Sequence, residues 1–367
     1  MANGLSLNSL LTAFAVPEKS DWMNAARKET GFDDPIAKLT QYVTKDLSIS
    51  PFYDHTDLLA IKYNDQYGLP PVDDENLSAR YWENVPAVAA ANPPAANKQA
   101  LTHLAKGANG IFFNGIEKPE ISLRDIDRSL CSLWFYIRAG KDETEAARLL
   151  NTESTHNTIL LWEHTPAKPE QFFARSGQSR GLGIAVPRKT DVIEEITTAL
   201  TTAVRLLDAL TEQGLAPSAI GSQVCFSFSV ERDFFIAVAK FKAMRRLWYQ
   251  VMRSYEVHDF PYNDHFLHAR CESTTDERYE PRSALIANAF AALAAVCGGC
   301  DALTVFPDVD DQDVAATVAR NIPTILAHEA HLDKTSDPFS GAYFLESLVH
   351  NIAKRAWTAF ANGPGHS

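Results

Sequence analysis

The residues whose types and spacing could support chemistry gather in one short segment, which contains His268, Arg270, Cys271 and Glu272. If the segment is a strand, alternation places His268, Arg270 and Glu272 on one face and Cys271 on the other. An imidazole, a guanidinium and a carboxylate on one face could bind an acyl or carboxylate group. They could equally form an ion pair that fills the mouth of a barrel, which is the simpler interpretation. Both interpretations stay open at this point.

Other clusters of reactive residues favour structural interpretations. Cys297 and Cys300 have the spacing of a redox pair, but they lie at the end of a predicted helix, whereas a reactive thiol favours a helix N-terminus. The two glycines between them suit a helix C-cap, and no second cysteine pair completes a zinc site. His328 and His331 are three residues apart rather than the four of a helical zinc motif, so we expect them on the surface.

The elements that position these residues are predicted by the hydrophobic pattern. An apolar run from Cys225 to Val230 is followed at once by an amphipathic helix from Asp233 to Ser254, with Asp233 as N-cap. This is one unit of a parallel sheet covered by helices. On that helix, we expect Lys240, Lys242 and Arg246 to keep their charges at the edges.

The same unit recurs eight times. Predicted strands cover Val85–Ala91, Ile111–Asn114, Trp134–Ile137, Thr158–Trp162, Gly183–Val186, Cys225–Val230, Phe266–Cys271 and Ala302–Phe306. Predicted helices cover Asn97–Lys106, Leu123–Leu130, Glu143–Leu150, Asp191–Gln213, Asp233–Ser254, Arg282–Cys297, Gln312–His331 and Gly341–Phe360, and the fourth position, after Trp162, shows no clear helix. The count predicts an α/β fold, a (β/α)8 TIM barrel over residues 81–367, after an N-terminal helical and extended arm over residues 1–80. A doubly wound sheet would need a glycine-rich phosphate turn after the first strand, and none is present.

Composition excludes several function classes. The 367 residues carry a formal net charge of -12, and the basic residues are scattered, so we expect no nucleic-acid surface. The N-terminus fits neither a signal peptide nor a membrane span. Five cysteines, an odd number, indicate reduced, buried thiols and a cytoplasmic protein.

Several segments together resemble the cobalamin-dependent acyl-CoA mutases, the methylmalonyl-CoA mutase family. The resemblance rests on Asp233–Trp248, His268–Ser273, Ala291–Cys300, Ala319–Asn321 and Asp337–Ser347, and Asn97–Gly110 resembles the first unit of the small subunits. The resemblance extends over about Trp82 to Leu348, and its segments follow one another in the same order as in the family. It implies a (β/α)8 barrel and an N-terminal arm that wraps a partner subunit.

The departures from the family pattern concern the residues of catalysis. Ile184–Thr190 lacks the Tyr-His pair of catalytic members, and Gln223-Val-Cys225 stands where they have Arg-x-Ser. Their Thr-His-Cys-Gln-Thr is replaced by Ala269–Ser273, the loop that covers the corrin is shortened to Val305–Asp311, and their substrate motif near the first strand is not recognisable. The Asp-x-His-x-x-Gly motif of the cobalamin domain is missing. A radical rearrangement without these groups has nothing to lower its barriers.

The resemblance therefore implies a non-catalytic, small-subunit-type barrel that forms a heterodimer with a large catalytic mutase subunit. Adenosylcobalamin is expected on that partner, and no cofactor or metal on this chain alone. The alternative is an acyl-CoA mutase that recruits a separate cobalamin-binding chain and accepts an acyl-CoA through His268, Arg270 and Glu272. A hydrolase or aldolase barrel has the least support, because no strand ends in a lone lysine or in metal-type ligands.

Overall fold

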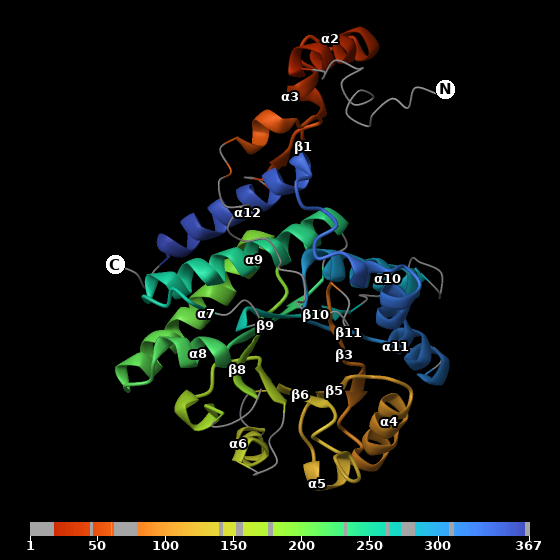
Figure 1. Cartoon of the computed structure of the whole chain (residues 1–367), viewed down its shortest axis with the longest axis vertical. Coiled ribbons are helices and arrows are strands. Elements are labelled where there is room, and N and C mark those ends of the chain that lie inside the picture. Colours follow the sequence, from red (N-terminus) through yellow and green to blue (C-terminus); the bar gives the residue numbers. More distant parts are fainter. Residues whose placement is uncertain are drawn as a thin grey trace, which may run out of the picture.

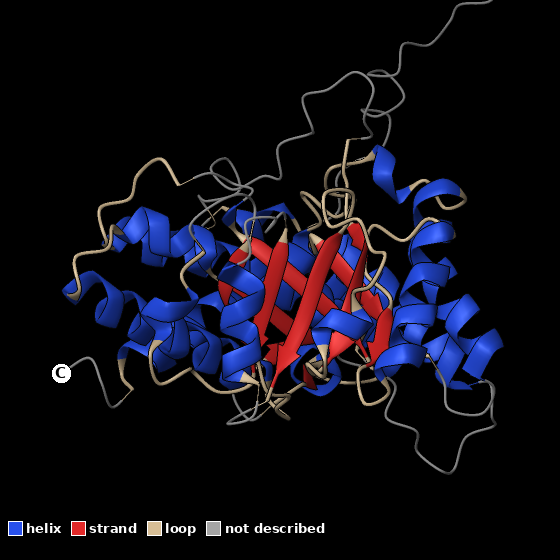
Figure 2. Cartoon of the chain, turned by 90° about the horizontal axis from the view of Figure 1, so that it is seen from below, coloured by secondary structure: helices blue, strands red, loops and turns tan. Residues whose placement is uncertain are grey.

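A computed structural model describes residues 18–44, 47–59, 61, 79–138, 142–151, 157–174, 179–230, 233–260, 264–272, 283–307 and 312–363. Its main body is one sheet of parallel strands enclosed by helices (Figure 2). The strands are β3 (Glu83–Asn84), β4 (Ala87–Ala89), β5 (Gly110–Asn114), β6 (Ser132–Ile137), β7 (Thr158–Trp162), β8 (Arg180–Ala185), β9 (Cys225–Ser229), β10 (Phe266–Cys271) and β11 (Ala302–Val305).

The sheet closes on itself through its first strand. The order runs β3-β11-β10-β9-β8-β7-β6-β5-β4, so β3 and β4 are its two ends. They are also consecutive in the chain, separated only by Val85 and Pro86. The Val85 N–H donates to Leu303 O at 3.0 Å, and the Phe112 N–H donates to Pro86 O at 3.0 Å, so this stretch pairs with both neighbours. The fold is therefore an eight-stranded (β/α)8 barrel, as the strand count predicted.

The helices α4 (Pro93–Ala105), α5 (Pro119–Ser122), α6 (Glu143–Asn151), α7 (Val192–Glu212), α8 (Pro217–Gln223), α9 (Phe234–Ser254), α10 (Ser283–Gly298), α11 (Gln312–His328) and α12 (Tyr343–Ala361) cover the outside of the barrel (Figure 1). The predicted helix over Leu123–Leu130 is wrong. Asp125 has a left-handed φ of 60°, and the Asp127 carboxylate accepts from the Ser129 N–H at 3.0 Å, which stabilises a turn instead.

The helical layer is incomplete after β7. Between β7 and β8 the described residues form only a short 3-10 helix, η2 (Pro169–Phe172). Phe172 packs edge-on against Trp162, with ring centroids 4.4 Å apart, and so covers the strands where a full helix would lie. A Cβ on Gly181 would overlap the Phe172 carbonyl, which explains a glycine at this close approach.

The arm rises from the α12 side of the barrel (Figure 1). It contains α2 (Lys19–Thr30), α3 (Pro35–Leu39), and an antiparallel pair of β1 (Gln41–Tyr42) and β2 (Ser48–Ile49), followed by the 3-10 helix η1 (His55–Leu58). The Lys19 ammonium lies 2.8 Å from the Asp57 carboxylate, which joins α2 to η1. Residues 1–17, 45–46, 60 and 62–78 of the predicted arm lie outside the described residues, and the division at residue 80 stays a prediction.

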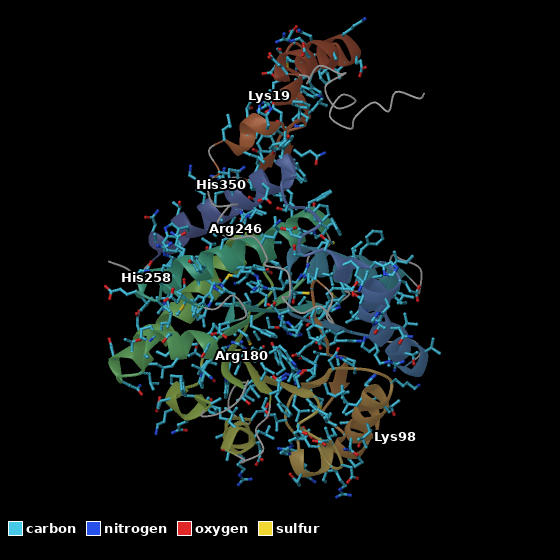
Figure 3. All side chains as sticks on the ribbon, viewed as in Figure 1. Lys19, Lys98, Arg180, Arg246, His258 and His350 are labelled. Atoms are coloured by element: carbon cyan, nitrogen blue, oxygen red, sulfur yellow. The ribbon has the colours of Figure 1, made fainter. Side chains whose placement is uncertain are left out.

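One prediction about α9 is wrong. Lys240 does not lie at an edge but is fully buried, with its Nζ 2.7 Å from Glu195 Oε2 and 2.7 Å from Ser229 O. Because α7 supplies a buried carboxylate opposite, the lysine can remain inside the protein. Arg246, labelled in Figure 3, forms an ion pair with Glu346 of α12 at 2.9 Å, so it links α9 to α12.

Candidate functional site

The axis of the barrel is filled by large side chains. His268 of β10 lies between Trp134 of β6, with ring centroids 4.6 Å apart, and Phe112 of β5, at 5.7 Å. Phe266 packs against Trp134 at 5.7 Å toward the N-terminal end of the strands, and Phe306 packs against Phe112 at 5.7 Å toward the C-terminal end. We call these five residues the axial cluster. They make the interior a packed core.

His268 is held as a neutral core residue. Thr304 Oγ1 donates to Val85 O at 2.7 Å, so toward His268 Nε2, at 2.9 Å, it can only accept. Nε2 therefore carries the proton, and Nδ1 accepts from Ser227 Oγ at 2.8 Å. Burial, assisted by the nearby Arg270 charge, holds the pKa of His268 well below its usual range. Both ring nitrogens are engaged, so this histidine has no capacity left for a substrate.

Hydrogen bonds hold the Trp134 indole in place at the N-terminal end of the barrel. Its Nε1–H donates to Ser132 Oγ at 2.9 Å, and Ser132 Oγ donates to Glu83 Oε2 at 2.5 Å. A Cβ on Gly110 would overlap the Ser132 side chain, so glycine at this position makes room for the chain of hydrogen bonds. Burial is the main cause that raises the pKa of Glu83.

Arg270 and Glu272 lie where the sequence predicted them, at the C-terminal mouth. Alternation is confirmed, because Cys271 packs in the outer core while His268 and Arg270 face inward. Arg270 is buried, donates to Val186 O at 3.0 Å, and lies over the Tyr136 ring at 5.6 Å. Its contact with Glu272 is 3.6 Å long, and Glu272 is half-exposed. The pair lies at the C-terminal end of β10. A role for it in binding an acyl group stays a prediction.

The other sequence candidates take structural positions. All five cysteines are free and buried, and burial raises the pKa of Cys297 to about 11 and of Cys300 to about 12, so neither is poised as a thiolate. His328 and His331 are exposed, as expected. Within the part of the chain that the structure describes, no group of three or more His, Cys, Asp or Glu side chains could hold a metal ion, and no helix is long and apolar enough to cross a membrane.

His268, the histidine of the axial cluster, does not fit a cobalamin lower ligand. Such a ligand needs an imidazole with a free nitrogen, and the only histidine of the axial cluster has both nitrogens engaged in hydrogen bonds.

Sequence reasoning missed the Lys240–Glu195 pair and the axial cluster. Lys240 also lies 5.1 Å from the Phe228 ring, and Glu195 Oε1 accepts from the Lys189 N–H at 2.7 Å. The pair thus fixes the loop before α7 to the end of β9. A signal was available, because each charge interrupts an otherwise apolar helix face, but the partner is 45 residues away in the chain.

The fold and the site together define a (β/α)8 barrel with a filled axis. Residues 190–362 match the family model described as methylmalonyl-CoA mutase. The methylmalonyl-CoA mutase small subunit of Porphyromonas gingivalis is 26% identical over 88% of this chain and 59% of that protein. The small subunit of Streptomyces virginiae is 34% identical over 76% of this chain and 51% of that protein. The chain belongs to the methylmalonyl-CoA mutase family.

The chain spans between about half and three fifths of the length of these two relatives. Among solved structures, a dihydropteroate synthase of Yersinia pestis is similar with a TM-score of 0.42 and 13% identity, over 68% of this chain and 93% of that one.

Proposed function

We propose that the chain is a non-catalytic small-subunit-type member of the family, which pairs with a catalytic mutase subunit and stabilises it. The observation that carries the proposal is the axial cluster. Trp134 and His268 are fully buried, and Phe112 nearly so, at the centre of the barrel. An acyl-CoA could occupy that space only if several aromatic rings were displaced or replaced by smaller side chains. Each replacement of a buried aromatic side chain by alanine costs about 3–5 kcal/mol of stability.

Exposed apolar side chains support the pairing. Helix α10 carries no charged residue from Ser283 to Gly298, and a helix that is apolar all round is normally buried. Yet Ile286 and Phe290, one turn apart, are each 60% exposed. On the arm, Tyr42 and Leu59 are 74% and 73% exposed. Surfaces of this kind are typical of protein interfaces.

Co-expression with the catalytic mutase subunit of the same organism tests the proposal. We expect the two chains to elute together from size exclusion in equal amounts, with adenosylcobalamin bound by the partner. A variant with Ile286→Glu and Phe290→Glu is expected to weaken the complex at least tenfold, because two charges would be buried without partners.

The matched control is Leu130→Glu, since Leu130 is also an exposed apolar residue but lies in the turn before β6. The control should elute as the wild-type complex does. Separate elution of the two wild-type chains would contradict the proposal.

One observation favours the alternative, an acyl-CoA mutase that recruits a separate cobalamin-binding chain. Arg270 is a buried cation whose carboxylate partner Glu272 is 40% exposed, and its Nε has no acceptor among the described residues. The alternative predicts that the isolated chain binds an acyl-CoA and that Arg270→Met abolishes the binding. The proposed function predicts no such binding.

A further inference from the structure

A cavity of about 230 Å³ lies outside the barrel, in the region where the helical layer is incomplete. Its walls come from the end of β7 and the following loop, from the outer face of β8, and from α7. The fully formed barrel would place a helix between β7 and β8. Since the described residues there form only η2, the apolar outer face of β8 borders a hollow.

The floor of the cavity is apolar. Leu182, Ile184 and Val186 project outward from β8 and the residue after it, and Ala199 and Leu206 face them from α7. Among the lining residues that the structure describes, none is a lysine or an arginine. The titratable lining residues are Glu163 and His164, and both are exposed at the rim. An apolar floor under a polar rim is the usual composition of a small-molecule site.

The hydroxyls of α7 define which polar group would fit. Thr198 Oγ1 donates to Glu194 O at 2.7 Å, and Thr202 Oγ1 donates to Thr198 O at 2.9 Å. Each hydroxyl has thus used its hydrogen and presents only lone pairs. Glu163 adds a carboxylate, which is also an acceptor. The α7 hydroxyls and Glu163 therefore favour a ligand with a hydrogen-bond donor, and the side chains that could donate to an anion, His164 and Thr165, are exposed to solvent.

The size of the cavity limits the ligand. An apolar cavity of about 150 Å³ accepts benzene, so this one has room for roughly nine non-hydrogen atoms. We propose that the cavity binds a small, non-anionic molecule with an apolar body and a hydroxyl or similar donor at one end. The site is separate from the barrel axis and needs no partner subunit, so it is independent of the proposed function.

The test uses two probes of one shape, 4-fluorobenzyl alcohol and 4-fluorobenzoate, which differ in the donor alcohol and the acceptor-only carboxylate. Binding to the full chain is followed by fluorine NMR. We expect the alcohol to bind with a Kd on the order of 1 mM, as for other ligands of this size, and the carboxylate at least about tenfold more weakly.

Two variants locate the binding. Thr202→Leu fills the cavity and removes an acceptor, and should abolish binding of the alcohol. The matched control is Thr102→Leu on α4, the helix that carries Lys98, labelled in Figure 3. Thr102 makes the same hydroxyl-to-carbonyl bond, to Lys98 O at 2.8 Å, but it is exposed and is not among the lining residues of the cavity. This control should bind as the wild type does, and thermal unfolding verifies that both variants fold.

Three results would overturn the proposal. These are no binding of the alcohol at about ten times the expected Kd, unchanged binding in Thr202→Leu, and a carboxylate that binds as tightly as the alcohol.

Discussion

Replacing Trp134 by alanine is the sharpest perturbation of the axial cluster. The indole is fully buried, packs against His268 and Phe266, and donates its Nε1–H to Ser132. The substitution removes these contacts and leaves a hollow on the axis. Because eight strands surround the site, the neighbours can move little to close it.

The cost follows from the size of the deletion. Truncating a buried tryptophan or phenylalanine to alanine lowers the free energy of unfolding by about 3–5 kcal/mol, and the lost hydrogen bond adds about 1 kcal/mol. For a domain this large we expect Tm to fall by roughly 8–24 °C. Trp134→Phe keeps most ring contacts and loses the donor, so we expect a smaller loss, about 1–2 kcal/mol.

Urea unfolding and thermal unfolding of the three proteins, with and without indole, measure these effects. Indole should raise the stability of Trp134→Ala, by about 2.7 kcal/mol at one hundred times its Kd, and leave the wild type unchanged. A loss below about 1 kcal/mol, or no rescue by indole, would refute the claim that the axis is a packed core.

Two further predictions concern buried charge. Burial lowers the pKa of three histidines in the folded protein, to about 4 for His103, to about 3 for His265 and well below the usual value for His268. The unfolded chain takes up these protons near pH 6.5, and the folded chain does not. The free energy of unfolding is therefore highest above about pH 6.5 and decreases as the pH is lowered further. The slope approaches about 1.4 kcal/mol per pH unit for each histidine, which urea unfolding between pH 7.0 and 5.5 would detect; a flat profile would contradict the prediction. Glu195→Gln leaves Lys240 buried without its carboxylate and should cost about 3–5 kcal/mol in urea unfolding. Adding Lys240→Met should restore most of that loss, and equal stability of the single and double variants would argue against the pair.

The strands could be predicted because each is a short apolar run between polar segments. Thr158–Trp162 and Phe266–Cys271 have the predicted bounds. The axial cluster could not be predicted, because the strands of a parallel barrel are apolar on both faces. Nothing in the pattern around Trp134 says whether its ring faces the axis or the helices. On β10 the polar residues His268 and Arg270 indicate which face is distinct, and no such residue does so around Trp134.

The errors have local physical causes. At Leu123–Leu130 the apolar spacing suits a helix, but Asp125 has a left-handed φ and the Asp127 side chain accepts from the Ser129 N–H, which favours a turn. Helix periodicity predicts an edge position for Lys240 because it takes no account of the neighbouring helices. Its partner, Glu195, lies on another helix, and a buried ion pair depends on tertiary packing that helix periodicity does not describe.

Titration of the catalytic mutase subunit with this chain, while mutase turnover is followed, tests the central claim most directly. The account predicts that turnover with adenosylcobalamin rises and saturates at one molar equivalent, and that this chain alone shows none. A turnover that stays flat throughout the titration, or turnover by this chain without the partner, would contradict the account.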